Sequence, residues 1–275
     1  SNVAALCNLG GMHYDAEDFE ASLRVLDAAL ARAPSVPEVV CSRANTLHRL
    51  NRTAEAIAEY TRVVAALPGV LAYRRGLADL LAGAGRLEEA VVEYETAQRH
   101  ASADTAASPS DRAATLSGLA EVYRKQGRTE EAINHYKQAV EQDPADGRLL
   151  MNAAVVLADE RHVKEALPLF RRAVAARPHD ALLLSNFGTV LHRMGEFRES
   201  ALLYSQALKL TPGTANLHYN LANSVMDLAI QTDVRLLRDS VLHYEECLYR
   251  EATYPGAMNN LGNALWRIDK HDKAL

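Results

Sequence analysis

The sequence predicts an all-α fold, a right-handed superhelical solenoid of antiparallel helix-turn-helix repeats. Three observations lead to this prediction: an internal period of 34 residues, small side chains at two fixed positions of the period, and prolines that recur in phase with it. The stretch AEVYRKQGRTEEAINHYKQAVEQDP at 120–144 recurs as GTVLHRMGEFRESALLYSQALKLTP at 188–212, with intermediate copies elsewhere. A regular repeat of this length is typical of stacked helical hairpins.

Eight repeats align on this period and are predicted to form a single array over residues 3–275. They start near Val3, Pro37, Leu71, Ala113, Gly147, Ala181, Ala215 and Pro255. Position 8 of each repeat is Gly or Ala: Gly10, Ala44, Ala78, Ala120, Ala154, Gly188, Ala222 and Gly262. Position 20 is Ala or Ser: Ser22, Ala56, Ala90, Ala132, Ala166, Ser200, Ser240 and Ala274. Larger side chains would push two crossing helices apart, so these positions predict where the helices of each hairpin cross.

Larger residues at position 24 are predicted to fill the layer between hairpins. They are Leu26, Tyr60, Tyr94, Tyr136, Phe170, Tyr204 and Tyr244. Prolines that end the second helix follow in five repeats, because proline lacks the N–H that a helix needs. These are Pro34, Pro68, Pro144, Pro178 and Pro212.

Two insertions interrupt the period. Extra residues near 105–112 lie in HASADTAASPSDR and predict a mobile loop. Six extra residues within 226–239 predict that both helices of repeat seven lengthen and project from one edge, with Thr232-Asp233 as a helix cap. The second insertion is either a contact site or a tolerated change at a surface turn.

The 34-residue helix-turn-helix with small residues at positions 8 and 20 resembles the tetratricopeptide repeat family. The resemblance covers nearly the whole chain. It implies that the first helix of each repeat lines a concave groove, and that positions 2, 5, 6, 9, 12 and 13 face or border this groove. Binding residues are therefore expected on the first helices.

Asparagine is frequent at the two central groove positions. Position 6 holds Asn8, Asn152, Asn186, Asn220 and Asn260, and position 9 holds Asn45, Asn223 and Asn263. A carboxamide both donates and accepts hydrogen bonds, so a row of them can bind the backbone of an extended peptide. The run is similar to the asparagine ladder in the repeat domain of O-GlcNAc transferase. The alternative is that these are polar residues tolerated on an open helix face.

Two aromatic residues also belong to the predicted groove. Tyr219 lies at position 5 of repeat seven, and Trp266 lies at position 12 of repeat eight. Trp266 is either an anchor for a ligand side chain or a packing residue that a further repeat would cover.

Composition narrows the partners and the compartment. The net charge of −5 and the absence of a long basic run argue against nucleic acid. No segment approaches the length of an apolar membrane span. Three cysteines without CxxC spacing predict reduced thiols, which favours the cytoplasm, with the lumen of the endoplasmic reticulum as the alternative.

No catalytic or cofactor motif is visible, so the chain is predicted to be non-catalytic, with no cofactor and no metal site. The leading hypothesis is a scaffold that binds an extended peptide or partner segment in the groove. The alternative is the substrate-recruiting domain of a larger glycosyltransferase, because HYNLAN at 218–223 and YPGAMNNLGN at 254–263 are also similar to repeats of O-mannosyltransferases. Ala274 is expected to lie at the start of a truncated second helix, which predicts that the chain is part of a longer protein. The identity of the ligand and the oligomeric state are left open.

Overall fold

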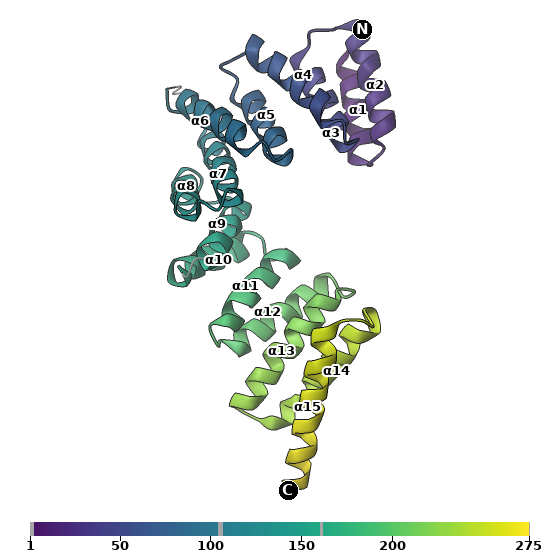
Figure 1. Cartoon of the computed structure of the whole chain (residues 1–275), viewed down its shortest axis with the longest axis vertical. Helices are drawn as coiled ribbons and strands as arrows, with labels where there is room; N and C mark the ends of the chain where they lie inside the picture. The colour runs from purple at the N-terminus through teal and green to yellow at the C-terminus, as the bar shows by residue number, and fades with distance from the viewer. Residues whose placement is uncertain (1–2, 104–106, 160–161, 275) are drawn as a thin grey trace. The chain divides into compact units, whose positions relative to one another are not determined.

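The structure is a computed structural model, and it describes residues 3–103, 107–159 and 162–274. Within these ranges the chain forms fifteen α-helices and one 3₁₀ turn, and no strand occurs among them (Figure 1). The all-α prediction is confirmed. The helices cluster into two compact units, unit 1 (Ser1–Pro144) and unit 2 (Ala145–Leu275). The prediction of one continuous array across both units stays a prediction.

Unit 1 contains four helical hairpins. Their helices are α1 (Val3–Asp15), α2 (Phe19–Arg32), α3 (Pro37–Arg49), α4 (Thr53–Ala66), α5 (Leu71–Gly83), α6 (Leu87–Ala103), α7 (Pro109–Lys125) and α8 (Thr129–Gln142). Unit 2 contains three hairpins and a final helix. These are α9 (Gly147–Asp159), α10 (Val163–Ala176), α11 (Ala181–Arg193), α12 (Phe197–Leu210), α13 (Ala215–Gln231), the 3₁₀ turn η1 (Val234–Leu236), α14 (Leu237–Arg250) and α15 (Pro255–Ala274).

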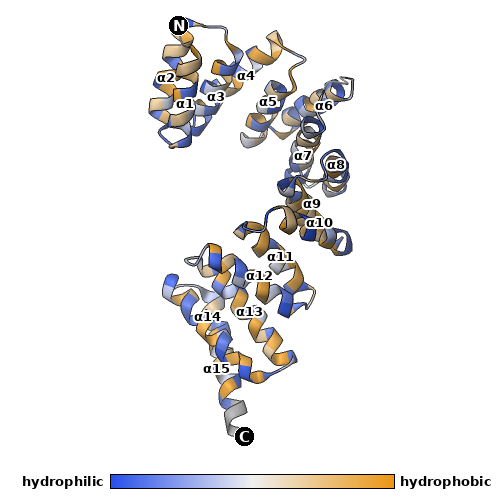
Figure 2. Ribbon diagram, turned by 180° about the vertical axis from the view of Figure 1, so that it is seen from behind, coloured by the Kyte–Doolittle hydropathy of each residue, from blue (hydrophilic) through white to orange (hydrophobic). Residues whose placement is uncertain are grey.

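In repeats one to seven the small residues of the period are buried where the helices of a hairpin meet, as predicted, whereas Gly262 of repeat eight is exposed. Among the described side chains at position 20, every one is fully buried, from Ser22 in α2 to Ser240 in α14. The position-24 side chains between hairpins are also buried, from Phe170 at 0% exposure to Tyr60 at 5%. In Figure 2 most helices carry both apolar and polar segments, in keeping with one face packed and the other solvated.

The turn inside most hairpins depends on one left-handed residue at position 15. The residues with positive φ there are Glu17, Asn51, Gly85, Gly127 and Gly195. The backbone then closes a bond across the turn, as from Arg86 N to Leu81 O at 2.9 Å. Glycine suits this position because it has no Cβ to oppose a left-handed conformation.

Helix ends agree with the predicted role of the prolines. Five second helices end two residues before Pro34, Pro68, Pro144, Pro178 and Pro212. The prediction that these prolines separate consecutive hairpins is confirmed.

The insertions differ in part from the prediction. The loop expected over 100–112 is wrong at both ends, because α6 continues to Ala103 and α7 begins at Pro109. Ser108 caps α7 by accepting a hydrogen bond from Asp111 N at 3.0 Å. Residues 104–106 lie outside the described part of the chain.

In repeat seven only the first helix is lengthened. Helix α13 has 17 residues, whereas α14 has 14 residues like most second helices, and the remaining insertion forms η1. Asp233 caps η1, with its carboxylate accepting from Arg235 N at 3.0 Å. The expected lengthening of the second helix is therefore wrong, because the capped 3₁₀ turn takes up the extra residues.

Repeat eight also departs from the prediction. Helix α15 runs without interruption for 20 residues, so Ala274 continues a first helix and does not belong to a second one. At position 15 this repeat has Asp269, which lies within the helix and not in a left-handed turn. The local signal that starts the turn elsewhere is missing here.

Candidate functional site

The predicted site lies on the first helices, and its chemistry depends on a hydrogen bond that recurs within the repeat. The tyrosine hydroxyl at position 24 meets the side chain at position 9 of the same repeat. The pairs are Tyr60–Asn45 at 3.1 Å, Tyr94–Asp79, Tyr136–Glu121 at 3.4 Å, Tyr204–Thr189 at 2.8 Å and Tyr244–Asn223 at 2.6 Å. Position 9 therefore acts first as a partner for the buried tyrosine.

The repeats without a position-24 tyrosine support this relation. In the repeat with Leu26 at position 24, position 9 is Gly11, and in the repeat with Phe170, position 9 is Val155. Position 9 therefore has no polar side chain where position 24 has no hydroxyl. Burial raises the pKa of the tyrosines, for example Tyr60 and Tyr94, well above the ordinary range. Their hydroxyls consequently stay protonated and act as donors.

This relation changes what two predicted site residues can do. The Oδ1 atoms of Asn45 and Asn223 accept hydrogen bonds from tyrosines of their own repeats. Sequence reasoning treated both as peptide-binding residues and missed their internal partners. The matching of positions 9 and 24 along the chain is the signal that would have found them.

The position-6 asparagines of unit 2 lie on α9, α11 and α13 at the same register position. Asn152, Asn186 and Asn220 are all half-buried. Their carboxamides make no hydrogen bond with any described residue. Helix α9 packs on α11, and α11 packs on α13, so the three side chains occur on consecutive neighbouring helices.

The fourth asparagine of this run has internal partners. Asn260 Nδ2 donates to Asn223 Oδ1 at 2.8 Å and lies 3.5 Å from the hydroxyl of Tyr219. Tyr219 in turn packs on Tyr254, with ring centroids 4.9 Å apart. Asn260 and Tyr219 thus form a polar and aromatic cluster that joins α13 to α15.

The remaining predicted site residues lie near the ends of the chain. Asn8 on α1 and Asn263 on α15 are exposed. Trp266 on α15 is also exposed, at 55%. Asn8 belongs to unit 1, whereas Asn263 and Trp266 belong to the final helix of unit 2.

Unit 1 has a different surface at the equivalent positions. Position 6 is Gly76 in α5 and Gly118 in α7, and a Cβ atom on either would approach the ring of Tyr60 or Tyr94 to 2.5 or 2.4 Å. The tyrosine ring of the preceding repeat therefore leaves no room for a side chain at position 6 of these two repeats. Charged groups lie nearby: Arg75 Nη1 bonds Asp111 Oδ1 at 3.1 Å.

Acidic residues on this face have perturbed pKa values. Burial raises the pKa of Asp79, although the hydrogen bond from Tyr94 opposes the change. A hydrogen bond from Arg124 lowers the pKa of Glu121. The first carboxylate accepts a hydrogen bond from Tyr94, and the second is ion-paired with Arg124.

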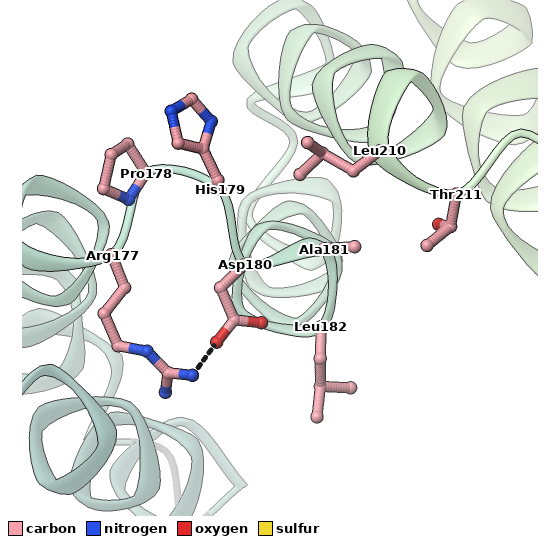
Figure 3. Close-up of a pocket in the computed structure, with 8 residues that line it drawn as sticks. All are labelled: Arg177, Pro178, His179, Asp180, Ala181, Leu182, Leu210 and Thr211. Atoms are coloured by element: carbon pink, nitrogen blue, oxygen red, sulfur yellow. Dashed lines mark ion pairs between the residues drawn. The ribbon is translucent and has the colours of Figure 1, made fainter.

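A shallow pocket of about 790 Å³ opens in unit 2 at the turn between α10 and α11 (Figure 3). Arg177 Nη2 pairs with Asp180 Oδ2 at 2.8 Å along one side, and Leu182 and Leu210 form apolar parts of the lining. Asp180 also caps α11 by accepting from Leu183 N at 3.0 Å. These polar groups have structural partners, so this pocket offers no assembled reactive group.

The described residues contain no cluster of three or more His, Cys, Asp or Glu side chains able to hold a metal ion. Within the same residues no helix is long and apolar enough to cross a membrane. The predictions of no catalysis and no cofactor stay predictions.

Comparison with known proteins agrees with the repeat architecture. Two models of the tetratricopeptide repeat match, one over residues 7–70 and 118–181 and the other over 69–145. Together they span residues 7–181. A search of curated proteins finds no match.

Solved structures share the fold at low sequence identity. YrrB, described as a tetratricopeptide repeat protein with an unusual peptide-binding site, has a TM-score of 0.60 and 20% identity, over 73% of this chain and 96% of its own. PilF of Pseudomonas aeruginosa has a TM-score of 0.63 and 17% identity, over 78% of this chain and 94% of its own.

A third structure is the Cut9–Hcn1 hetero-tetramer of APC/C, with a TM-score of 0.64 and 18% identity. The match covers 88% of this chain but spans only 45% of the matched chain.

The repeat pattern, the hairpin packing and the two family models lead to one conclusion. The chain belongs to the tetratricopeptide repeat family, whose repeats serve as scaffolds for protein–protein interaction.

Proposed function

We propose that the first-helix face of unit 2 binds an extended peptide segment of a partner protein through backbone hydrogen bonds. We use "first-helix face" for the surface of α9, α11 and α13 that carries Asn152, Asn186 and Asn220. The observation that carries the proposal is that these three half-buried carboxamides recur at one register position and have no described partner. A half-buried amide contributes favourable binding free energy when a ligand takes the place of the water molecule to which the amide is hydrogen-bonded.

The chemistry of asparagine suits a peptide backbone. Each carboxamide offers N–H donors and a carbonyl acceptor, which complement the C=O and N–H of an extended chain regardless of its side chains. The solved structure of YrrB supports the proposal by analogy, since that protein shares the fold and has a peptide-binding site.

The expected affinity is modest. Each carboxamide contributes about 0.5–1.5 kcal/mol net, and ordering a flexible peptide offsets part of the total. Dissociation constants in the micromolar range are therefore expected.

The test compares the wild type with a variant carrying Asn152→Ala, Asn186→Ala and Asn220→Ala. Fluorescence polarisation with a panel of unrelated capped peptides should show about a tenfold or larger loss of affinity across the panel. Alanine favours helix, so the variant should keep its fold, as circular dichroism would verify.

A matched control removes three amide side chains from second helices, through Asn134→Ala, Gln138→Ala and Gln206→Ala. This control should bind like the wild type. Equal binding by the wild type and the α9, α11 and α13 variant would refute the proposal. The glycosyltransferase context depends on other segments of a parent protein and stays a prediction.

A further inference from the structure

A second candidate site lies in unit 1, where a cavity of about 110 Å³ opens between α1, α2 and α3. Its lining includes Gly11 and Tyr14 of α1, Leu26 of α2, and Ser42 and Asn45 of α3. A Cβ atom built on Gly11 would have no neighbouring atom within 4 Å, which shows open space on this side.

The same place is occupied by an aromatic ring in the other hairpins. Position 24 is tyrosine or phenylalanine in six repeats and leucine only in repeat one, at Leu26. Repeat six gives the closest internal comparison. Its frame of Gly188, Ser200 and Ser224 corresponds to Gly10, Ser22 and Thr46 of repeats one and two.

The two frames have the same hydrogen bonds. Ser22 Oγ donates to Gly10 O at 2.9 Å and lies 3.1 Å from Thr46 Oγ1. In unit 2, Ser200 Oγ donates to Gly188 O at 2.8 Å and lies 2.9 Å from Ser224 Oγ. The hydrogen-bonded frames therefore match, whereas the residues at positions 24 and 9 differ.

In repeat six the occupant is Tyr204. A Cβ atom on Gly188 would lie 3.1 Å from its ring, and its hydroxyl meets Thr189 Oγ1 at 2.8 Å. In repeat one the shorter Leu26 and the missing side chain of Gly11 leave this space unfilled. The cavity lies beside Leu26 and Gly11, at the register positions where Tyr204 meets Thr189 in the equivalent hairpin.

The lining suits a phenol. Leu26 and the ring of Tyr14 provide apolar walls, and Asn45 provides a polar end. Asn45 Oδ1 accepts from Tyr60 at 3.1 Å, whereas its Nδ2 makes no hydrogen bond with any described residue. An apolar cavity of roughly 150 Å³ binds benzene, so this space has the size for one ring partly open to solvent.

The aromatic wall is held in place. Tyr14 packs edge-on against Phe19, with centroids 5.4 Å apart. The guanidinium of Arg49 covers Phe19 at 4.3 Å and Tyr14 at 5.6 Å. A site formed in advance in this way loses little free energy to ordering when a ligand binds.

We propose that this cavity is an anchor pocket for a tyrosine side chain of a partner protein. The partner's ring packs on Leu26 and Tyr14 in the open space beside Gly11, and its hydroxyl accepts a hydrogen bond from Asn45 Nδ2. The proposal deepens the scaffold function, on which it rests for the source of the side chain.

The test uses p-cresol, the side chain of tyrosine as a free molecule, in an NMR titration of the full chain. The wild type should show saturable shifts at the amides of Gly10, Gly11 and Ser42. Toluene, which lacks the hydroxyl, should bind several-fold more weakly, in line with the loss of one hydrogen bond. Absence of saturable shifts at these amides would overturn the proposal.

Two substitutions fill the pocket from inside. Leu26→Tyr places the residue of the other repeats at position 24 and should abolish the p-cresol shifts. Leu26→Phe should do the same and serves if the tyrosine variant fails to fold. Unchanged p-cresol binding by a folded variant would contradict the proposal. The converse change, Tyr204→Leu, should create new p-cresol shifts at Gly188 and Thr189.

Peptides separate this proposal from the proposed function. Tyrosine-containing peptides should lose about tenfold in affinity with Leu26→Tyr, whereas peptides without an aromatic residue should be unaffected. The variant of Asn152, Asn186 and Asn220 should weaken both groups. Failure of the p-cresol titration overturns the pocket alone, and failure of the asparagine variant overturns the backbone-binding role alone.

Discussion

The first helices of the two units present different surfaces although the hairpins are the same. In unit 1, Gly76 and Gly118 make room at position 6 for the rings of Tyr60 and Tyr94. In unit 2 the same position carries Asn186 and Asn220. Position 6 thus leaves room for a tyrosine ring in repeats three and four, whereas it offers a carboxamide in repeats six and seven.

The residue pairs at positions 4 and 23, which lie between helices, also differ between the two units. Positions 4 and 23 of repeat three hold the ion pair Arg74–Glu93 in unit 1. The same positions in repeat seven hold His218 and His243 in unit 2, with their Nδ1 atoms 3.3 Å apart. Opposite charges stabilise one another at any ordinary pH, whereas two adjacent imidazoles resist protonation.

The largest effect is expected at Arg43, which fills position 7 of repeat two where unit 2 has apolar residues such as Phe187. Arg43 pairs with Asp27 and with the buried carboxylate of Glu59. Arg43→Leu leaves Glu59 buried without its main partner, and should reduce the free energy of unfolding by about 3 kcal/mol. Urea denaturation combined with hydrogen exchange of unit 1 measures this.

Arg43→Leu with Glu59→Leu is the matched control, because position 23 is leucine in unit 2 at Leu169 and Leu203. The double variant should recover most of the loss, since an apolar pair can replace a buried ion pair. If the Arg43→Leu variant is as stable as the wild type, the ion pair does not contribute to the free energy of unfolding.

The next-largest effect on stability is expected when the position-6 residues of the two units are exchanged. Gly118→Asn puts a side chain where the ring of Tyr94 lies, and should cost about 2 kcal/mol through overpacking. The reverse change, Asn220→Gly, removes side-chain atoms and should cost about 0.5 kcal/mol through helix propensity. Equal costs, measured by thermal unfolding, would mean that the ring does not determine which residue fits.

A smaller effect concerns acid sensitivity of unit 2. Burial lowers the pKa of His243 and His218 lowers it further, against the opposing charges of Asp239 and Glu246. The folded state then binds fewer protons than the unfolded chain, so stability should decrease as pH falls below the ordinary histidine value of 6.5.

The variant His243→Leu should melt with a weaker dependence on pH below this value, because it removes the proton that unfolding takes up. Melting temperatures of the wild type and the variant between neutral and mildly acidic pH provide the measurement. Parallel curves would exclude His243 as the source of any acid sensitivity.

The smallest effect is expected at Asp79. Burial raises its pKa, so the neutral carboxyl is favoured in the folded state, and stability is lost as pH rises through the folded-state pKa. Asp79→Asn should therefore raise the melting temperature slightly at neutral pH. Asn45 and Asn223 already accept the same tyrosine hydrogen bond in other repeats. A lower melting temperature would show that the charge of Asp79 is needed.

The sequence predicted the features that depend on side-chain volume. In repeats one to seven, positions 8, 20 and 24 and the prolines were correct because close packing and the missing proline N–H act within each repeat. The lengthening of α13 was predicted, but the ordinary length of α14 and the long α15 were not, because they depend on a capped 3₁₀ turn and on the absence of a left-handed residue. The asparagine positions were found, but their partners were not.

Residues 15 positions apart, such as Tyr60 and Asn45, meet only through a particular rotamer, which residue types alone do not fix. Asn260 is a further example, since its partners Asn223 and Tyr219 come from another helix. The cavity beside Leu26 was also not predicted, because it results from a missing volume that is visible only against the filled hairpins.

The central claim is that a partner peptide lies along α9, α11 and α13. Hydrogen exchange of the full chain, with and without the tightest-binding peptide of the panel, tests it most directly. Slower exchange is expected in segments of these first helices, with little change in α10, α12 and α14. Protection confined to the second helices, or none in unit 2, would contradict it.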